Sequence, residues 1–291
     1  MIRRTIHRDM KVLAIATADW HLREDSPVCR LDNFWNAQWE KVSFVKSLQQ
    51  KYDCPVLHAG DLFHHWKPSP HLLSVTMDFI PDQFYTVYGN HDLPQHNMSL
   101  RDKSGIYTLE TAGKLHTLAE ASWNELPQEG SLSLGGLNIL VWHVMTWTHK
   151  TPFPGCQTAS AEKLLERYPF DIIITGDNHQ TFVSELNGRI LINPGSLTRQ
   201  TASQIDFQPC VFLILEGGTT KEIPLPIHKD VITRGHLEQK EQRDQRIEAF
   251  VSRLNQEWEG GVSFEENLHK FEQSNQIRQS VMDIVWKSIE T

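Results

Sequence analysis

Residues 12–21 read VLAIATADWH, an apolar run that leads into Asp19 and His21. A short β-branched and aliphatic run followed by polar side chains is typical of a buried strand with a functional group at its end. The same order recurs after four further strand-like runs, at Gly60-Asp61, Gly89-Asn90-His91-Asp92, His143 and Gly176-Asp177-Asn178-His179. Carboxylate, imidazole and amide groups are the donors that hold paired divalent cations in phosphoester-cleaving sites. The sequence therefore predicts a site for two metal ions.

Strand-like and helical patterns alternate in the first half of the chain. Apolar residues at helical spacing cover 33–52 and 72–80, between the early strand-like runs. Later strands lie closer together and pair across Gly135-Gly136 and Asn187-Gly188, which are hairpin signals. We therefore expect an α/β fold, with two mixed β-sheets packed as a sandwich with flanking helices. The expected strands are 12–17, 56–59, 84–88, 132–134, 137–144, 171–175, 181–186, 189–192 and 211–215.

The composition changes after about His236. The segment 238–259 is rich in Gln, Glu and Arg, with Ile247, Phe250 and Leu254 at helical spacing, and the segment 264–286 is similar. We expect one domain at 1–236, which carries the motifs of the two-metal site, and a small C-terminal helical appendage at 237–291. The appendage is most simply a solvated helix face, and an apolar stripe that covers a partner is the alternative.

Charge and cysteine content limit the function classes. The net charge of -8 argues against a passive protein that coats a nucleic-acid backbone, although it does not exclude an acidic metal enzyme that cuts phosphodiesters. The four cysteines form no CxxC pair, so we expect no disulfide framework and no zinc knuckle. No apolar run reaches the roughly 18 residues of a membrane span. We expect a cytoplasmic protein with no membrane partner.

Spacing assigns the donors to two ions. Asp19 and His21 lie two residues apart, so in an extended segment they point to the same side and can chelate one ion. Asp61 follows a glycine that allows a sharp turn, and its carboxylate is expected to bridge both ions. We assign Asp177 to the second ion and His179 to the first. Asn90 is expected to give an amide oxygen to the second ion, and His143 is a further imidazole; the full expected set is Asp19, His21, Asp61, Asn90, His143, Asp177 and His179.

His91 is not needed as a metal ligand. It lies beside Asp92, whose carboxylate is expected to hold the tautomer of the imidazole and to raise its basicity. A histidine in this position can protonate a leaving oxygen. We therefore predict that His91 and Asp92 are catalytic while the metal-activated water attacks phosphorus.

The motifs resemble a known superfamily. Residues 12–196 resemble the calcineurin-like metallophosphoesterases. The stretch GDLFHHWKPS at 60–69, with GNHDLP at 89–94 and NPGS at 193–196, is more narrowly similar to the SbcD-type nuclease subunit of DNA double-strand-break repair exonucleases. This resemblance implies manganese-dependent exonuclease and endonuclease activity on DNA, an SMC-like coiled-coil ATPase partner and a homodimer.

The resemblance also implies roles for individual residues. His91 matches the family's catalytic histidine, and His64 matches a histidine that positions the phosphate for exonucleolytic cleavage, although a cleft-lining role for His64 stays open. The chain departs from the family at Asp177, where the usual motif is GHxH. A carboxylate there favours Mn²⁺ or Mg²⁺ over zinc. The positions that match family ligands are Asp19, His21, Asp61, Asn90, His143 and His179.

The motifs and composition of the chain leave three function classes open. The first is a DNA exonuclease or endonuclease of repair or recombination, in which Phe63, Trp66 and Lys67 contact DNA by stacking or by charge. The second is a small-molecule phosphodiesterase or phosphatase of the same fold. The third is a non-catalytic binding scaffold. The nearly complete donor set disfavours the third class, and the 60–69 stretch favours the first over the second.

Overall fold

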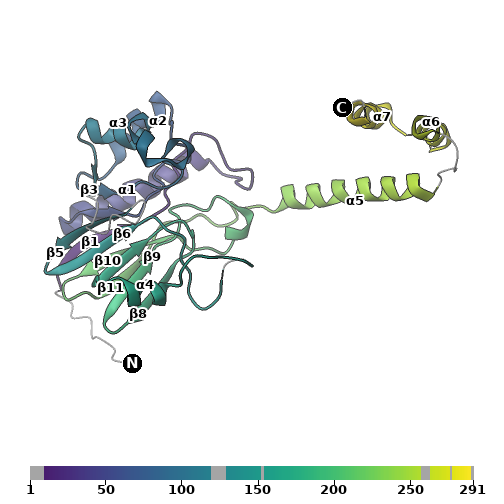
Figure 1. The fold of residues 1–291 in the computed structure, drawn as a ribbon. Coiled ribbons are helices and arrows are strands. Elements are labelled where there is room, and N and C mark those ends of the chain that lie inside the picture. Colours follow the sequence, from purple (N-terminus) through teal and green to yellow (C-terminus); the bar gives the residue numbers. More distant parts are fainter. Residues whose placement is uncertain (1–9, 119–128, 152–153, 257–262, 276, 290–291) are drawn as a thin grey trace. The chain divides into compact units, whose positions relative to one another are not determined.

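The computed structural model describes residues 10–118, 129–151, 154–256, 263–275 and 277–289 of the 291-residue chain (Figure 1). The chain divides into two compact units, Met1–Thr233 and Arg234–Thr291, which are described separately below. The functional domains expected at 1–236 and 237–291 stay a prediction.

The first sheet has six strands within the described residues, in the order β11-β10-β1-β2-β3-β4. Strands β1 to β4 are parallel, whereas β10 pairs antiparallel with both β1 and β11. The sequence pattern did not predict β4 or β11, because β4 has only two residues and β11 is mostly polar. The strands are β1 (Val12–Thr17), β2 (Val56–His58), β3 (Phe84–Thr86), β4 (His116–Thr117), β10 (Cys210–Leu215) and β11 (Thr220–Pro224).

The second sheet has five strands in the described part of the chain, in the order β5-β6-β7-β9-β8. Strands β6, β7 and β9 are parallel, and the antiparallel pairs β5–β6 and β8–β9 are the two expected hairpins. The strands are β5 (Glu129–Leu134), β6 (Leu137–Trp142), β7 (Ile172–Thr175), β8 (Phe182–Leu186) and β9 (Arg189–Asn193).

The two sheets pack face to face. On β7, Ile172 and Ile174 join a buried cluster that contains side chains of both sheets, including Ala16 of β1. Ile173 points to the opposite face, where it packs with Leu165 of helix α4 (Ala161–Arg167). Successive strand residues point to opposite faces, so each buried strand contributes to two layers. The structure confirms the expected α/β fold with two mixed sheets and flanking helices.

Helices cover the outer face of the first sheet (Figure 1). Val42 and Val45 of α1 are fully buried there. The side chain of Asn33 caps the start of α1, and Ser69 caps α2 just before Pro70, as first-turn chemistry favours. The helices of this unit, besides α4, are α1 (Phe34–Tyr52), α2 (Pro70–Phe79), α3 (Gly105–Thr111) and the 3₁₀ turns η1 (Pro94–His96), η2 (Met98–Lys103) and η3 (Ala202–Gln204).

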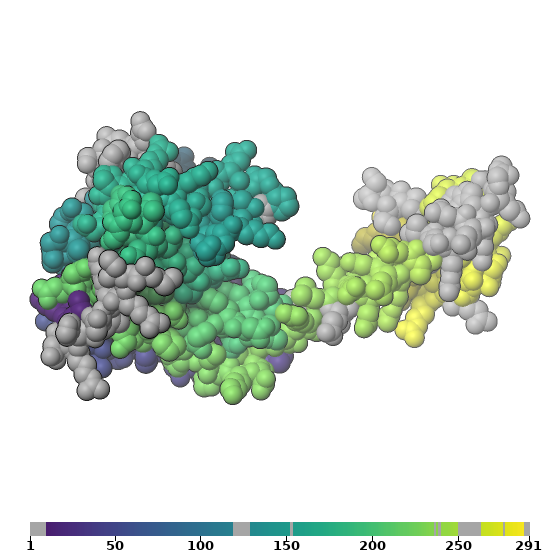
Figure 2. Space-filling model, turned by 90° about the horizontal axis from the view of Figure 1, so that it is seen from below, coloured from purple at the N-terminus to yellow at the C-terminus, as the bar shows by residue number. Residues whose placement is uncertain are grey.

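Figure 2 shows one face of this first unit in space-filling form. Segments coloured teal and segments coloured green lie side by side on it, so the middle and the later part of the chain share one surface.

The second unit is helical, with α5 (Gly235–Gln256), α6 (Phe264–Asn275) and α7 (Gln279–Ile289). Leu268 and Phe271 of α6 and Met282 of α7 are buried, whereas Val281 and Ile284 of α7 are exposed. No helix in the described ranges is both long enough and apolar enough to cross a membrane.

Candidate metal centre

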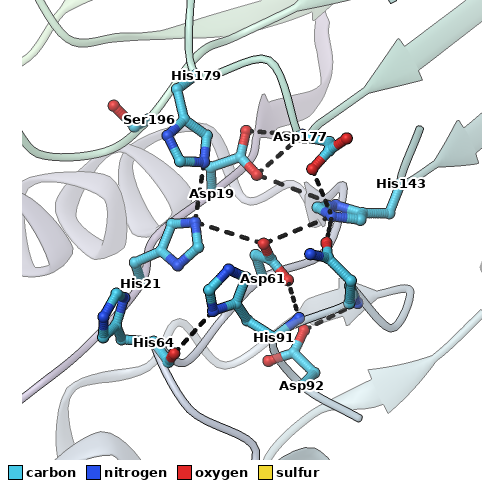
Figure 3. A network of polar contacts seen from close by, with 12 residues as sticks. Asp19, His21, Asp61, His64, His91, Asp92, His143, Asp177, His179 and Ser196 are labelled. Carbon is cyan, nitrogen blue, oxygen red and sulfur yellow. Dashed lines mark hydrogen bonds and ion pairs between the residues drawn. The ribbon is translucent and has the colours of Figure 1, made fainter. Parts of the chain in front are cut away.

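The carboxyl ends of parallel strands from both sheets converge on one place (Figure 3). The N–H of His21 donates to the carbonyl of Asp61 at 2.9 Å, which holds the loop after β1 beside the loop after β2. The N–H of Asp177, after β7 of the other sheet, donates to both carboxylate oxygens of Asp19 at 3.0 and 3.1 Å. Loops from the two sheets are therefore tied together at the expected donors.

The donors reach one another through unusual backbone conformations. Five non-glycine residues of the site have positive φ: Asp19 (49°), His21 (44°), Asp61 (57°), Asp177 (73°) and His179 (62°). Non-glycine residues rarely adopt this left-handed region, and such strain is concentrated at functional sites. The expectation that Asp19 and His21 chelate from an extended segment is therefore wrong, because the backbone turns at each donor.

Four residues form a first potential ligand group, namely Asp19, His21, Asp61 and His179. The Nε2 atoms of His21 and His179 face each other at 3.0 Å, and Nε2 of His21 lies 3.4 Å from Oδ2 of Asp61. Two neutral imidazoles have only two ring protons to share among four nitrogens, and both rings here aim a nitrogen at the same point beside a carboxylate. This arrangement suits a shared cation.

A second potential ligand group contains Asp61, His143 and Asp177. The Nδ1–H of His143 donates to the carbonyl of Ala59 at 2.8 Å, so Nε2 is directed into the site. There Nε2 lies 2.7 Å from Oδ1 of Asn90, 3.5 Å from Oδ2 of Asp61 and 3.8 Å from Oδ1 of Asp177. One imidazole nitrogen is thus surrounded by three oxygen ligands of the kind that divalent cations take.

The buried charges of the site fit a pair of cations. Oδ2 of Asp61 and Nδ1 of His21 are buried without a hydrogen-bond partner among the described residues. Burial raises the pKa of Asp19 to about 8. Burial alone would lower the pKa of His143, but the carboxylates of Asp61, Asp19 and Asp177 raise it above its ordinary value. Two buried carboxylates, with the partly exposed Asp177 beside them, are costly without positive charge, so divalent ions would complete the group.

Two glycines make this close approach feasible. A Cβ on Gly89 would lie 2.0 Å from Oδ1 of Asp61, and a Cβ on Gly60 would lie 2.6 Å from Nδ1 of His143. Gly60 also has a φ of +84°, which L side chains rarely adopt. Glycine is therefore required at both positions by the packing of the donors.

Comparison with known proteins identifies the fold family. A family model for the calcineurin-like phosphoesterase superfamily domain matches residues 10–216. The chain belongs to this superfamily. None of the curated proteins matches this phosphoesterase.

Several solved structures resemble the phosphoesterase at low identity. A novel archaeal phosphodiesterase is 14% identical, covers 73% of this chain and 99% of its own, and has a TM-score of 0.44. Vacuolar protein sorting 29 from Cryptosporidium parvum is 17% identical, covers 76% of this chain and 100% of its own, and has a TM-score of 0.37. A conserved uncharacterized protein from Streptococcus pneumoniae, described as a predicted phosphoesterase, is 15% identical. It covers 73% of this chain and 97% of its own, and has a TM-score of 0.34.

His91 lies against the first ligand group of the phosphoesterase. Its ring centroid is 4.8 Å from that of His21, and its backbone N–H donates to Oδ1 of Asp61 at 2.8 Å. Its Nδ1 lies 2.9 Å from the carbonyl of His64, which fixes the ring with Nδ1 as donor. The ring of His64 stacks on that of His91, with centroids 5.5 Å apart. Burial, together with Arg23 and His91, lowers the pKa of His64 to about 4.

The hydrogen-bond partners of the Asp92 carboxylate differ from those that the sequence predicted. Its carboxylate accepts hydrogen bonds from the backbone N–H groups of Leu62, Phe63 and Gly89, at 2.9–3.2 Å. Burial raises the pKa of Asp92 to about 7. The expected partnership of Asp92 with the ring of His91 is wrong, because the carbonyl of His64 takes that place. Asp92 instead ties the loop after β2 to the loop after β3.

The three residues expected to contact substrate lie in different environments. Phe63 is 1% exposed and belongs to the core, so the prediction that it stacks on DNA is wrong. Trp66 is half-buried, with its ring centroid 5.4 Å from that of His65, and Lys67 is exposed. Phe63 faces inward because the loop after β2 packs along residues 21–22, where Leu22 donates to the carbonyl of Leu62.

One positioning residue escaped the sequence reasoning. Asn193, at the end of β9, is fully buried and donates from Nδ2 to the carbonyl of Gly176 and to Oγ1 of Thr175, both at 3.3 Å. Its Oδ1 accepts from the N–H of Gly195 at 3.0 Å. Asn193 therefore holds the loop that carries Asp177. The NPGS motif at 193–196 was a signal of importance but gave no role.

Proposed function

We propose that this phosphoesterase is a metal-dependent DNA phosphodiester hydrolase with exonuclease and endonuclease activity, acting in DNA repair or recombination. The observation that carries the proposal is the shared carboxylate of Asp61, whose Oδ2 lies 3.4 Å from Nε2 of His21 and 3.5 Å from Nε2 of His143. One oxygen between two imidazoles of separate groups is the arrangement that a two-metal site requires.

Each group in the centre has a task in phosphodiester cleavage. Two divalent ions held by the two ligand groups would lower the pKa of a water molecule and neutralise charge that grows on the phosphoryl oxygens. His91 directs its Nδ1 proton toward the carbonyl of His64, so in the doubly protonated imidazolium Nε2 is the nitrogen that would donate a proton to the leaving oxygen and leave the ring neutral. The ring of His64 stacks on that of His91. We propose that His64 positions the phosphate for cleavage near the end of a DNA strand.

The stretch at 60–69 supports DNA over a small molecule. It places the exposed Lys67 and the half-buried Trp66 on the same loop as Asp61. A cation and an aromatic ring beside a phosphodiester site help an acidic protein to hold a nucleic-acid end. Neither group is needed by a phosphatase that reads only one phosphate.

A substrate panel tests the proposal. Linear duplex DNA, single-stranded DNA, a cyclic dinucleotide and an aryl phosphodiester are incubated with the protein and Mn²⁺, and the products are resolved by gel and by chromatography. We expect both DNA substrates to be cut, with Trp66→Ala and Lys67→Ala weakening DNA cleavage and reducing its salt dependence. Cleavage of the aryl or cyclic substrate without cleavage of DNA would favour the small-molecule phosphodiesterase.

The ions we propose are Mn²⁺, with Mg²⁺ as the alternative. Asp177 supplies a carboxylate oxygen where the family motif has an imidazole, and Asn90 supplies a neutral amide oxygen beside it. Harder ligands favour Mn²⁺ and Mg²⁺ over zinc. Activity reconstituted with each ion after chelation separates them, and the highest activity with zinc would contradict this choice.

We also propose an SMC-like coiled-coil ATPase partner and a homodimer. The exposed Val281 and Ile284 of α7 give the helical unit an apolar strip for a partner helix. Light scattering of the purified chain measures the dimer, and co-purification with the ATPase of the same source measures the complex. Loss of the complex with Ile284→Glu, at unchanged cleavage of the aryl diester, is the expected result.

A further inference from the structure

We propose that a pocket beside His179 is a subsite for one nucleobase of the substrate. The pocket has a volume of about 560 Å³ and lies between the loop after β7 and the segment around η3. His179 both lines this pocket and belongs to the first ligand group. The pocket and the metal centre therefore share His179, which places the pocket next to the centre. This inference rests on the proposed function for the nature of the ligand.

The lining is polar but carries no lysine, arginine or carboxylate among the described residues. A second phosphate would need a cation to replace its water, so this pocket does not suit one. Amide, hydroxyl and aromatic groups are instead the usual surroundings of an uncharged heterocycle. The lining residues that supply such groups include Gln180, Thr181, Ser203 and Phe207.

Phe207 supplies an aromatic surface in the pocket. It is half-buried, and a Cβ placed on Gly195 would come within 3.0 Å of its Cζ atom. Gly195 has a φ of +74°, so its glycine is required by the backbone as well as by the ring. A base that stacks on an aromatic side chain gains affinity whichever of the four bases it is, because every base has a π-face.

The side-chain amides of the pocket differ in whether they are already hydrogen-bonded within the protein. Oε1 of Gln204 accepts from the backbone N–H groups of Gln200 and Thr201, and Nε2 of Gln208 donates to two carbonyls, so both are already used. Gln180 is exposed, and its side chain makes no hydrogen bond to the part of the chain that the structure describes. Its amide has both donor and acceptor available for the edge of a base.

The pocket has the size of a small-ligand site. Its volume falls within the range of about 300–1,000 Å³ that is usual for small-ligand sites. A base that enters a protein pocket has to leave its stack, which favours single-stranded or frayed ends. The geometry thus links the metal centre to recognition of an unpaired nucleotide.

Two chromogenic diesters test the subsite. Thymidine 5′-(4-nitrophenyl phosphate) carries a base, whereas methyl 4-nitrophenyl phosphate carries the same leaving group without one. With Mn²⁺ we expect the protein to favour the thymidine diester in kcat/KM, and Phe207→Ala to lower that value about tenfold while the methyl diester is unaffected. Phe207→Trp should retain the preference. Phe79→Ala, which removes a partly exposed ring from α2, is the matched control.

Binding gives a second readout that does not depend on turnover. Calorimetry compares thymidine 5′-monophosphate with inorganic phosphate in the presence of Mn²⁺. We expect the nucleotide to bind more tightly than phosphate, and Phe207→Ala and Gln180→Ala to remove the difference without changing the affinity for phosphate. Equal affinity for the two ligands in the unaltered protein, or equal losses on both diesters in Phe207→Ala, would overturn the subsite.

The outcomes separate the subsite from the proposed function. If DNA is not cut but Phe207→Ala selectively weakens the thymidine diester, then the subsite stands and the DNA assignment fails. If DNA is cut and the preference for thymidine is absent, then the DNA assignment stands and the subsite fails.

Discussion

The backbone N–H of His91 donates to Oδ1 of Asp61 at 2.8 Å. The proposed proton donor and the carboxylate shared by both ligand groups are therefore held in one rigid relationship. Oδ1 is occupied by this bond, which leaves Oδ2 for the cations. The bond uses the backbone of His91 and not its ring, so the side chain can be altered without disturbing the carboxylate.

Removal of the His91 ring should therefore abolish turnover and leave metal binding intact. We expect His91→Ala to lower kcat by about 10²- to 10⁴-fold, the usual contribution of a positioned general acid. Mn²⁺ titration by calorimetry should still show two ions. The control is His65→Ala, which alters an exposed histidine of the neighbouring loop. Loss of both ions from His91→Ala would show that His91 is a ligand.

Asp177 should set the metal preference of the second ligand group. Its Oδ1 lies 3.8 Å from Nε2 of His143, and its replacement by histidine would exchange an oxygen for a nitrogen ligand. We expect Asp177→His to raise the affinity for zinc relative to Mn²⁺ by about tenfold, because imidazole suits softer ions than carboxylate does. Competition between the two metals, followed by manganese electron paramagnetic resonance, measures the ratio. An unchanged ratio would mean that Asp177 is not a ligand.

Lys41 should make the stability of the protein depend on pH. Lys41 of α1 is 3% exposed and donates from Nζ to the carbonyl of Ala37 at 3.2 Å. Burial, aided by Arg30, lowers its pKa from 10.5 to about 8. The unfolded chain then binds the proton more readily, so the free energy of unfolding rises as pH increases from about 8 to 10.5.

A lysine-to-methionine change tests this effect. Lys41→Met keeps a long unbranched side chain and removes its charge. We therefore expect it to stabilise the protein at pH 7 by about 1–3 kcal/mol. Its advantage should shrink as the pH rises from 8 to 10.5, the window in which the lysine loses its proton. Urea unfolding at several pH values measures both, and Lys51→Met, at an exposed position of the same helix, provides the reference. A constant difference between Lys41→Met and the unaltered protein would contradict the assignment.

The sequence predicted the fold, and it named the residues that the structure brings together as potential ligands, because each donor follows a strand whose apolar run is easy to recognise. It could not predict where Asp92 points, since three backbone N–H groups from two loops decide that direction. Phe63 was misread for a similar reason, because only the packing of its loop reveals that its side chain faces the core. The pocket at Phe207 has no sequence motif and arises from segments that only the fold brings together.

The central claim is a pair of metal ions that share Asp61. Crystals soaked in Mn²⁺ and measured near the manganese absorption edge test it most directly. The account predicts two anomalous peaks roughly 3.5–4 Å apart, as in other two-metal sites. One should be surrounded by Asp19, His21, Asp61 and His179, and the other by Asp61, Asn90, His143 and Asp177. A single peak, or two peaks with Asp61 bound to only one of them, would contradict it.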